Sequence, residues 1–382
     1  MKEGLILRPH GVPRPPAIPY MPPIMRERVQ VLVDDYIRLG AIVPCERHEV
    51  KLLSPVFAVP KASGGFRLVH NLRALNATLT SLHFRMEGIA MLRHLARKGD
   101  YFIKIDFENA YLHVAMEAES SQWLGFQIGS KVYRWVAMPF GLNIAPRSFT
   151  KLVRPVMAVL RPRGIRCLAY LDDLILMAHS EHQVATEATF VLDLLDQLGF
   201  AINVAKSALT PSQQVQYLGF TLDSSQALIC VPAAKQSKIR KDLAGFLQLQ
   251  SCSVRLAACM LGKLRALMPA VHLPLLRSRQ LQYFVNQHIP AGWDPVHPIP
   301  EQVRHEVRDW EAFLGTWSGR TWLDDVPPVT SWWTRPTSVG GHSAPPPASN
   351  AAAGGCLPSS KPIQRPKKCK QQYLPQPRSR QI

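Results

Sequence analysis

Two adjacent acids lie inside an otherwise apolar stretch of this sequence. The stretch "LAYLDDLILMA", residues 168–178, carries Asp172 and Asp173 in its middle. Burying an ionised carboxylate without a partner is costly, so the pair is either a hairpin turn or part of a cation site. A third acid, Asp106, ends the β-rich segment "YFIKIDF". Carboxylates on adjacent strands are what two-metal phosphoryl transfer needs, with Mg²⁺ ions about 4 Å apart.

The segments around these acids predict the elements that would position them. Hydrophobic periodicity predicts a helix over 25–39, a hairpin in "SPVFAVPKASGGFRLVHNL", and helices in "RSFTKLVRPVMAVLRPRG" and "EHQVATEATFVLDLLDQLGF". "AYLHVAM" is expected to continue past the strand that ends at Asp106, and "VQYLGFTLDS" to form a further hairpin strand. Apolar residues recur at helical intervals from about 235 to 290, which predicts a mostly helical second domain.

Composition narrows the class of protein. The 382 residues include 45 Lys and Arg against 27 Asp and Glu, a net charge of +18 that favours a polyanionic partner, most simply nucleic acid. A ribosomal partner or a basic tail would give a similar excess. Seven cysteines form no CxxC pair, which argues against a zinc ribbon or a disulfide framework. Without a signal peptide or membrane span, we expect a soluble intracellular protein, cytoplasmic or nuclear, with no membrane partner.

Six motifs occur in order: "SPVFAVPKASGGFRLVHNLRALN", "IDFENAYLHV", "MPFGLNIAPRSFTKL", "YLDD", "LGFAINVAKS" and "QYLGF". This series resembles that of reverse transcriptases, and "HFRMEG", "LRPRGI" and "KSALTPSQQVQYLGF" look most like polymerases of DIRS-type retrotransposons. The resemblance is firm over residues 35–225 and looser over 225–310. It implies an α+β right-hand polymerase with fingers, a palm with an antiparallel sheet, and a helical thumb or connection, followed by a truncated or disordered tail.

The resemblance also implies domain bounds. The predicted divisions are a proline-rich N-terminal segment (1–25), fingers and palm (26–222), a helical thumb or connection-like region (223–310), and a degenerate ribonuclease H remnant (311–382).

Residue roles follow from the same motifs. The predicted ligands of two Mg²⁺ ions, with Mn²⁺ as a possible substitute, are Asp106, Asp172 and Asp173. Lys206 matches a lysine that protonates the leaving pyrophosphate, although it could equally be a solvated loop residue. The residues expected to bind the incoming deoxynucleotide are Lys61, Arg67, Asn109, Ala110, Tyr111 and Phe140. Those expected to contact primer or template are Tyr170, Gly141, Leu218 and Gly219.

These roles predict RNA-directed DNA synthesis, in which deoxynucleotides (dNTPs) are added to the 3′-hydroxyl of a DNA or RNA primer on an RNA template. Tyr111 matches an aromatic residue that blocks a ribose 2′-hydroxyl, which argues against an RNA-dependent RNA polymerase that shares the palm. Read without the resemblance, Tyr111 would be an ordinary core aromatic. A catalytically silent nucleic-acid-binding remnant of a decayed retroelement is the other alternative.

The C-terminal sequence departs from the family. No Asp or Glu follows Asp325, so a ribonuclease H site, which needs several carboxylates, cannot be assembled there and its activity is predicted to be absent. Trp332-Trp333-Thr334 must be encoded by TGG TGG ACN, and reading this sequence two bases further on gives GTG GAC, which encodes Val-Asp. The hypothesis is therefore a frameshift near codons 320–332 with an out-of-frame basic tail beyond. A genuine basic tail is the alternative, and Met1 can lie inside a longer polyprotein.

Overall fold

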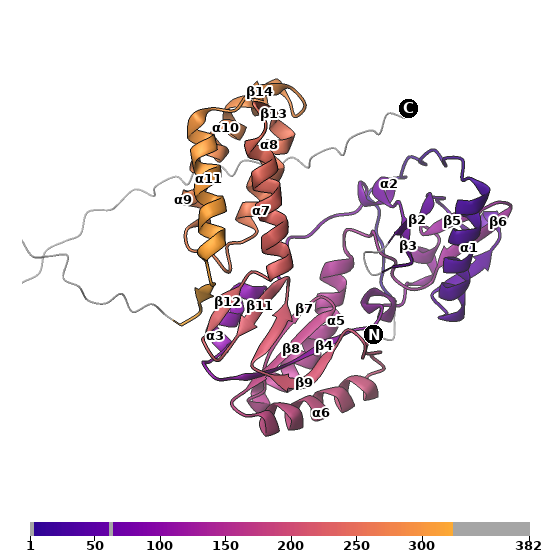
Figure 1. Ribbon diagram of the computed structural model, residues 1–382. Coiled ribbons are helices and arrows are strands. Elements are labelled where there is room, and N and C mark those ends of the chain that lie inside the picture. The colour runs from indigo at the N-terminus through magenta and orange to yellow at the C-terminus, as the bar shows by residue number, and fades with distance from the viewer. Residues whose placement is uncertain (1–3, 61–63, 324–382) are drawn as a thin grey trace, which may run out of the picture. The chain divides into compact units, whose positions relative to one another are not determined.

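The computed structural model describes residues 4–60 and 64–323 of the chain (Figure 1). Its central feature is an antiparallel sheet of four strands in the order β7-β8-β4-β9. These strands are β4 (Tyr101–Asp106), β7 (Arg166–Tyr170), β8 (Asp173–Ala178) and β9 (Ala208–Ser212). The hairpin predicted from residues 168–178 is therefore confirmed, and it pairs with the strand that ends at Asp106.

Two helices cover one face of this sheet. α5 (Ala145–Leu160) and α6 (Glu181–Gln197) lie along it in Figure 1, and their apolar residues share one core with Ile103 and Ile105 of β4. Side chains alternate between the faces of a strand. Phe102 and the other even-numbered residues of β4 therefore point to the opposite face, where Phe102 joins a second core with β10, β11 and β12.

The residues before the central sheet form a smaller sheet and a hairpin. The smaller sheet has the order β1-β6-β5, and β2 pairs with β3 in the predicted hairpin. The strands are β1 (Ile42–Cys45), β2 (Val56–Pro60), β3 (Phe66–His70), β5 (Gly125–Ile128) and β6 (Lys131–Trp135). They are preceded by α1 (Pro23–Arg38), which buries Val29 and Val33.

The proline-rich start of the chain is attached to this core. The backbone N–H of Leu5 donates to the carbonyl of Ala115 at 2.7 Å, and that of Leu7 donates to Ser120 Oγ at 2.8 Å. The Leu7 side chain is buried in the same core as α5 and α6. The segment predicted as residues 1–25 thus contributes to the fold that follows it.

The residues after β9 form another sheet and then helices. The strands β10 (Gln214–Tyr217), β11 (Phe220–Asp223), β12 (Leu228–Cys230) and β15 (Arg320–Thr321) pair in that order. The segment 233–316, termed the helical region, holds α7 (Ala233–Leu247), α8 (Val254–Arg265), α9 (Pro274–Arg277), α10 (Arg279–His288), α11 (Glu301–Thr316) and the short strands β13 (Ser251–Ser253) and β14 (Val296–Pro298). These helices enclose a third core.

Two expectations differ from the structure. α11 runs across the boundary predicted at residue 310, because Trp310 and Leu314 are buried in one core; residues 324–382 of the predicted remnant lie outside the described residues. The segment expected to continue past Asp106 is a 3-10 helix, Ala110–His113, because Asn109 turns the chain with φ 47°. The other short helices are α2 (Arg73–Asn76), α3 (Leu92–Leu95), α4 (Ala118–Ser121) and 3-10 turns at Arg47–Glu49, Ile89–Met91, Arg161–Arg163 and Ile289–Ala291.

Every helix within the described ranges is too short or too polar to reach across a lipid bilayer.

Candidate active site

The two adjacent acids lie at the tip of the β7–β8 hairpin. Tyr170 pairs with Asp173 across the hairpin, which leaves Leu171 and Asp172 as a two-residue turn. Leu171 has φ +52°, which is the sign that a type II′ turn requires at its first central position and which a bulky side chain rarely adopts. The turn carbonyl of Asp172 accepts from the Phe107 N–H at 2.8 Å. This bond ties the tip to the residue that follows Asp106.

Asp106 is the buried acid of the site. It lies opposite Asp173 in the β4–β8 register, and its side chain is 8% exposed. Its backbone N–H donates to Ser207 Oγ at 2.9 Å, and its carbonyl accepts from Asn203 N–H at 2.8 Å. These bonds bring the loop that carries Lys206 beside β4. Burial raises the pKa of Asp106, and the Asp172 carboxylate raises it further, while the Lys206 ammonium opposes both.

Asp173 has a different environment from the other two acids. Its Oδ1 lies 2.8 Å from Lys104 Nζ, and the two side chains are 19% and 18% exposed. Within residues 4–60 and 64–323, no three or more His, Cys, Asp or Glu side chains together form a metal site. Mg²⁺ in phosphoryl-transfer sites is usually bound by one or two carboxylates plus substrate phosphates. The hard oxygen ligands of Asp106 and Asp172 fit that mode, because binding would be completed by the nucleotide.

A cavity of about 960 Å³ opens at the hairpin tip. Many of the predicted residues line it, from both the central sheet and the β2–β3 hairpin: Arg67, Asp106, Asn109, Ala110, Tyr111, Phe140, Asp172 and Lys206. Asp173, Tyr170, Gly141, Leu218 and Gly219 are not among its lining residues. Lys61 lies outside the described residues. The structure thus brings together most of the predicted catalytic and nucleotide-binding side chains.

Two aromatic rings and an arginine form one wall of the cavity. The ring centroids of Tyr111 and Phe140 are 5.0 Å apart, and the Arg67 guanidinium carbon lies 5.8 Å from the Phe140 ring centroid. Phe149 contacts Tyr111 from behind, at 6.2 Å between centroids. Burial raises the pKa of the Tyr111 hydroxyl, and Asp172 raises it further. Tyr111 is therefore a neutral, well-supported ring at the cavity surface.

Asn109 and Ala110 line the cavity at the start of a short helix. Asn109 adopts a left-handed conformation, and Ala110 then begins the short 3-10 helix. The first N–H groups of a helix have no partner within it, which suits the predicted contact of Asn109 and Ala110 with phosphates.

The predicted primer and template residues lie at two other turns. Gly141 has φ +106°, and a Cβ there would lie 2.8 Å from the His70 carbonyl oxygen, so a glycine is required by a close approach within the protein itself. Leu218 and Gly219 both have positive φ in the β10–β11 turn, as a type I′ turn requires. Leu218 and Tyr170 pack against the same apolar core. Their contacts with nucleic acid stay predictions.

Sequence reasoning missed several residues that shape the site. Asn76 Nδ2 donates to the Gly141 carbonyl at 2.8 Å, and the Asn143 N–H donates to Asn76 Oδ1 at 3.0 Å. Tyr36 of α1 lines the cavity, and Asn203 Oδ1 accepts from the Lys206 N–H at 3.1 Å. The motif "NLRALN" contained Asn76 and "INVAKS" contained Asn203, but only the long-range pairing shows what they do.

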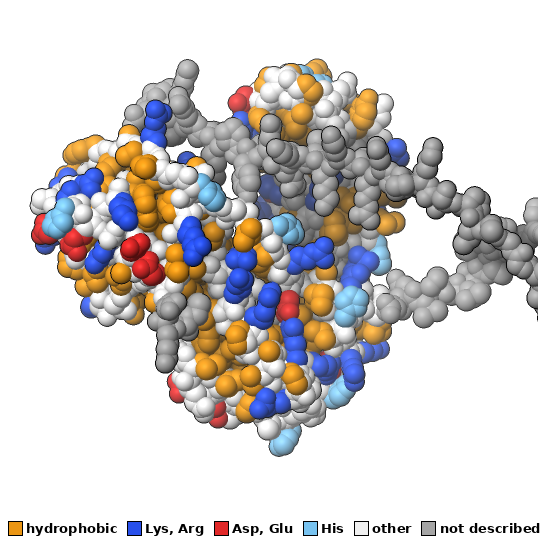
Figure 2. Space-filling model, turned by 180° about the vertical axis from the view of Figure 1, so that it is seen from behind, with side chains coloured by type: hydrophobic (Ala, Val, Ile, Leu, Met, Phe, Trp, Pro, Cys, Tyr) orange, Lys and Arg blue, Asp and Glu red, His pale blue; other side chains and the backbone are white. Residues whose placement is uncertain are grey.

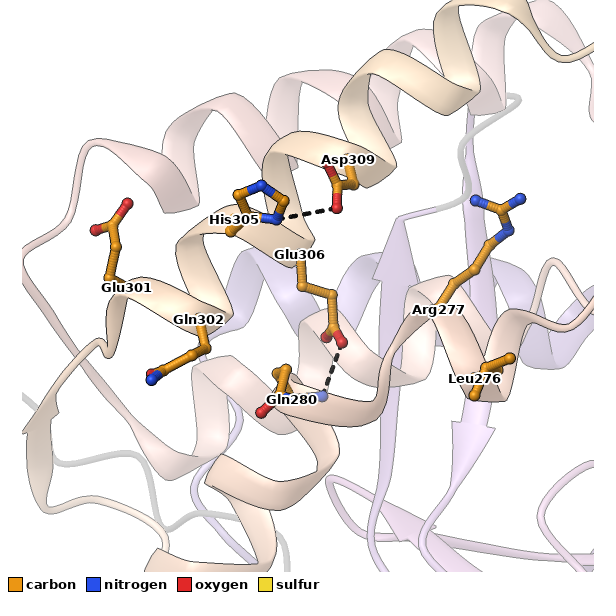
Figure 3. Close-up of a pocket in the computed structure, with 8 residues that line it drawn as sticks. All are labelled: Leu276, Arg277, Gln280, Glu301, Gln302, His305, Glu306 and Asp309. Carbon is orange, nitrogen blue, oxygen red and sulfur yellow. Dashed lines mark hydrogen bonds and ion pairs between the residues drawn. The ribbon is translucent and has the colours of Figure 1, made fainter.

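A second depression lies in the helical region, between α9 and α11 (Figure 3). Glu306 points toward the start of α10, where it accepts from the backbone N–H of Gln280 at 2.7 Å and of Leu281 at 2.9 Å. His305 Nδ1 lies 3.1 Å from Asp309 Oδ2. These acids already have partners, so the depression has a structural explanation.

The surface is basic as well. Lys and Arg side chains are visibly more frequent than Asp and Glu on the face shown in Figure 2, in line with the net charge of +18. Such a surface favours a polyanion.

Known proteins share these features. Residues 59–222 match the family model described as reverse transcriptase (RNA-dependent DNA polymerase). The chain is 30% identical over 206 residues to the Gag-Pol polyprotein of Rous sarcoma virus subgroup B, which covers 51% of this chain and 12% of the polyprotein. It is 27% identical over 199 residues to the transposon Tf2-7 polyprotein of Schizosaccharomyces pombe, covering 50% of this chain and 15% of that one. The chain therefore spans a small part of these relatives.

Solved structures agree on the fold. The foamy viral protease-reverse transcriptase in complex with an RNA/DNA hybrid superposes with a TM-score of 0.68 at 18% identity, covering 84% of this chain and 40% of that one. A second foamy viral protease-reverse transcriptase structure, in complex with double-stranded DNA, gives a TM-score of 0.66 at 17% identity, with 84% and 53% covered. The predicted right-hand polymerase fold is confirmed.

Proposed function

We propose that this chain, which carries a reverse transcriptase domain over residues 59–222, is an RNA-directed DNA polymerase of a retroelement. The observation that carries the proposal is the single cavity that joins Asp106 and Asp172 to Arg67, Tyr111 and Lys206. Motifs shared with DIRS-type retrotransposons suggest that subfamily. The template would be RNA and the primer DNA or RNA, since foamy viral relatives of this fold are in complex with an RNA/DNA hybrid and with double-stranded DNA.

The residues that line the cavity would have different roles in the reaction. Arg67 would bind the triphosphate of the incoming dNTP, since a guanidinium matches phosphate geometry. The primer 3′-hydroxyl would then give its proton to water, its oxygen would attack the α-phosphorus, the bond from that phosphorus to its bridging oxygen would break, and pyrophosphate would leave. Lys206 would give the leaving pyrophosphate a proton. Tyr111 and Phe140 would pack against the sugar and exclude a 2′-hydroxyl.

The acids would hold the cofactor. When bound by Asp106 and Asp172, with Asp173 beside them, two Mg²⁺ or Mn²⁺ ions would lower the pKa of the 3′-hydroxyl and balance the charge of the pyrophosphate. The protein's own contribution is to hold the buried Asp106 beside the exposed Asp172, against the repulsion between their two carboxylates.

The test is primer extension on a poly(rA)–oligo(dT) template with Mg²⁺ and dTTP. The chain should extend the primer, and Asp172→Asn should lose extension by at least about a thousandfold, because a metal ligand supplies several kcal/mol to the transition state. Asp309→Asn, the same change in the helical region, should stay within about twofold. A folded chain that binds the duplex but never extends it would favour the catalytically silent remnant.

Two further parts of the proposal concern regions beyond the cavity. Ribonuclease H activity is proposed to be absent from this chain because residues 326–382 contain no acid. Action in the cytoplasm or nucleus stays a prediction.

A further inference from the structure

Lys104 lies on the same face of β4 as Asp106. Strand residues two apart share a face, and the β4–β8 register puts Asp106 opposite Asp173 and Lys104 opposite Ile175. Asp173 is therefore the diagonal neighbour of Lys104, within reach of a long side chain. The 2.8 Å contact between Lys104 Nζ and Asp173 Oδ1 uses that diagonal.

This ion pair lies where a lone charge would be unfavourable. The face carries a core that includes Phe102, Ile175, Met177 and Tyr217, and the Lys104 and Asp173 side chains are mostly buried beside it. Removing either partner would leave the other charge poorly solvated, which costs far more than an exposed pair contributes.

The pair also divides the acids into two groups. Asp106, Asp172 and Lys206 line the cavity, whereas neither Asp173 nor Lys104 does. Among the described residues, no ion pair or side-chain hydrogen bond engages the carboxylate of Asp106 or Asp172, while that of Asp173 is engaged. The three aspartates are close in sequence and register, but they are not equivalent.

We propose that Lys104 is a positioning residue of the polymerase site, which holds Asp173 by an ion pair so that Asp106 and Asp172 alone receive the divalent cations. The inference rests on the proposed function and deepens it. Lys104 balances the charge of Asp173 and so sets the affinity of the neighbouring acids for cations. Loss of Lys104 would expose the cavity to one more negative charge, and loss of Asp173 would expose it to one more positive charge.

The test measures Mn²⁺ binding to the full chain, without nucleotide, from the electron paramagnetic resonance of the free ion. Lys104→Met should bind Mn²⁺ about fivefold more tightly, and Asp173→Asn about fivefold more weakly, as expected for one nearby unit charge. Lys104→Met combined with Asp173→Asn should return within about twofold of the unaltered chain, and Lys104→Arg should match it. Asp172→Asn should lose binding altogether.

A matched control is available in the helical region. Lys263 Nζ lies 2.7 Å from Asp242 Oδ2, and neither residue lines the cavity. Lys263→Met should therefore leave Mn²⁺ binding unchanged. A general loss of stability from removing a lysine would appear in both variants, whereas tighter Mn²⁺ binding should appear only with Lys104→Met.

Three results would overturn the proposal. Unchanged Mn²⁺ affinity in Lys104→Met would show a merely structural ion pair. A double variant as weak as Asp172→Asn would make Asp173 a direct ligand. No Mn²⁺ binding by the unaltered chain would remove the premise of two available carboxylates. Failure of the proposed function is separate, because it would appear as absent primer extension while the Mn²⁺ pattern still holds.

Discussion

Two groups of acidic side chains can be compared, one at the tip of the β7–β8 hairpin and one along α11 in the helical region. On α11, Glu306 accepts backbone N–H groups at the start of α10, and Asp309 contacts His305. At the hairpin tip, among the described residues, the carboxylates of Asp106 and Asp172 have no such partner. Within the described residues, Asp106 is thus a buried acid whose carboxylate has no protein partner, whereas the half-buried Glu306 is held by backbone N–H groups.

The largest expected effect separates activity from stability at Asp106. Asp106→Asn should lower primer extension by at least about a thousandfold and yet raise the midpoint of thermal unfolding, because a buried charge beside Asp172 is removed. The folded chain holds the proton of Asp106 to higher pH than the unfolded chain does, so this acid lowers stability as pH rises through its folded pKa. The stability gain should therefore be larger at pH 8 than at pH 4, measured by thermal melts. A lower midpoint at pH 8 would mean that the carboxylate stabilises the fold.

The next effect concerns the shape of the cavity. Tyr111→Val should remove the ring that packs on Phe140 and lower discrimination against ribonucleotides by about a hundredfold, measured as the ratio of kcat/KM for dTTP and UTP. Tyr283 in the helical region is 65% exposed, and Tyr283→Val should leave the ratio unchanged. Equal selectivity in Tyr111→Val and the unaltered chain would show that Tyr111 does not exclude the ribose 2′-hydroxyl. It would then favour the alternative of an RNA-dependent RNA polymerase.

Sequence patterns predicted structural features that depend on neighbouring residues. The apolar stretch 168–178, broken by Asp172 and Asp173, predicted the hairpin, and the family resemblance named the side chains of one proposed site, most of which line the same cavity. Contacts between distant segments had no such signal: Asn76 and Asn143 are 67 residues apart, and Leu7 packs into a core built by later helices. No sequence motif singles out Lys104, and only the strand register shows that it reaches Asp173. α11 was cut at residue 310 because the resemblance faded there, although its apolar face continues.

Two histidines, one buried and one exposed, should respond differently to pH. His70 of β3 is buried against Phe126, and burial lowers its pKa from 6.5 to about 3. In the unfolded chain His70 therefore takes up a proton below about pH 6.5, whereas in the folded chain it does so only near pH 3. Acid therefore lowers the stability of the folded state. Between pH 7 and pH 5 this should cost about 2 kcal/mol.

Difference measurements isolate that effect. The difference in unfolding free energy between the unaltered chain and His70→Gln, from urea titrations, should fall by that amount over the same pH range. His305 on α11 is exposed, so the difference for His305→Gln should change by less than about 0.5 kcal/mol. If the difference in unfolding free energy changed equally with pH for His70→Gln and His305→Gln, His70 would not be held neutral by burial.

The smallest effect tests the assignment of α11 acids to the fold. Glu306→Ala should lower the unfolding free energy by about 1 kcal/mol, because the backbone N–H groups of Gln280 and Leu281 lose the side chain that accepts from them. Primer extension should stay within about twofold at a temperature where both proteins are folded. The opposite pattern, unchanged stability with lost extension, would place a functional acid in the helical region. It would also show that a carboxylate already bound by backbone N–H groups can still take part in the reaction.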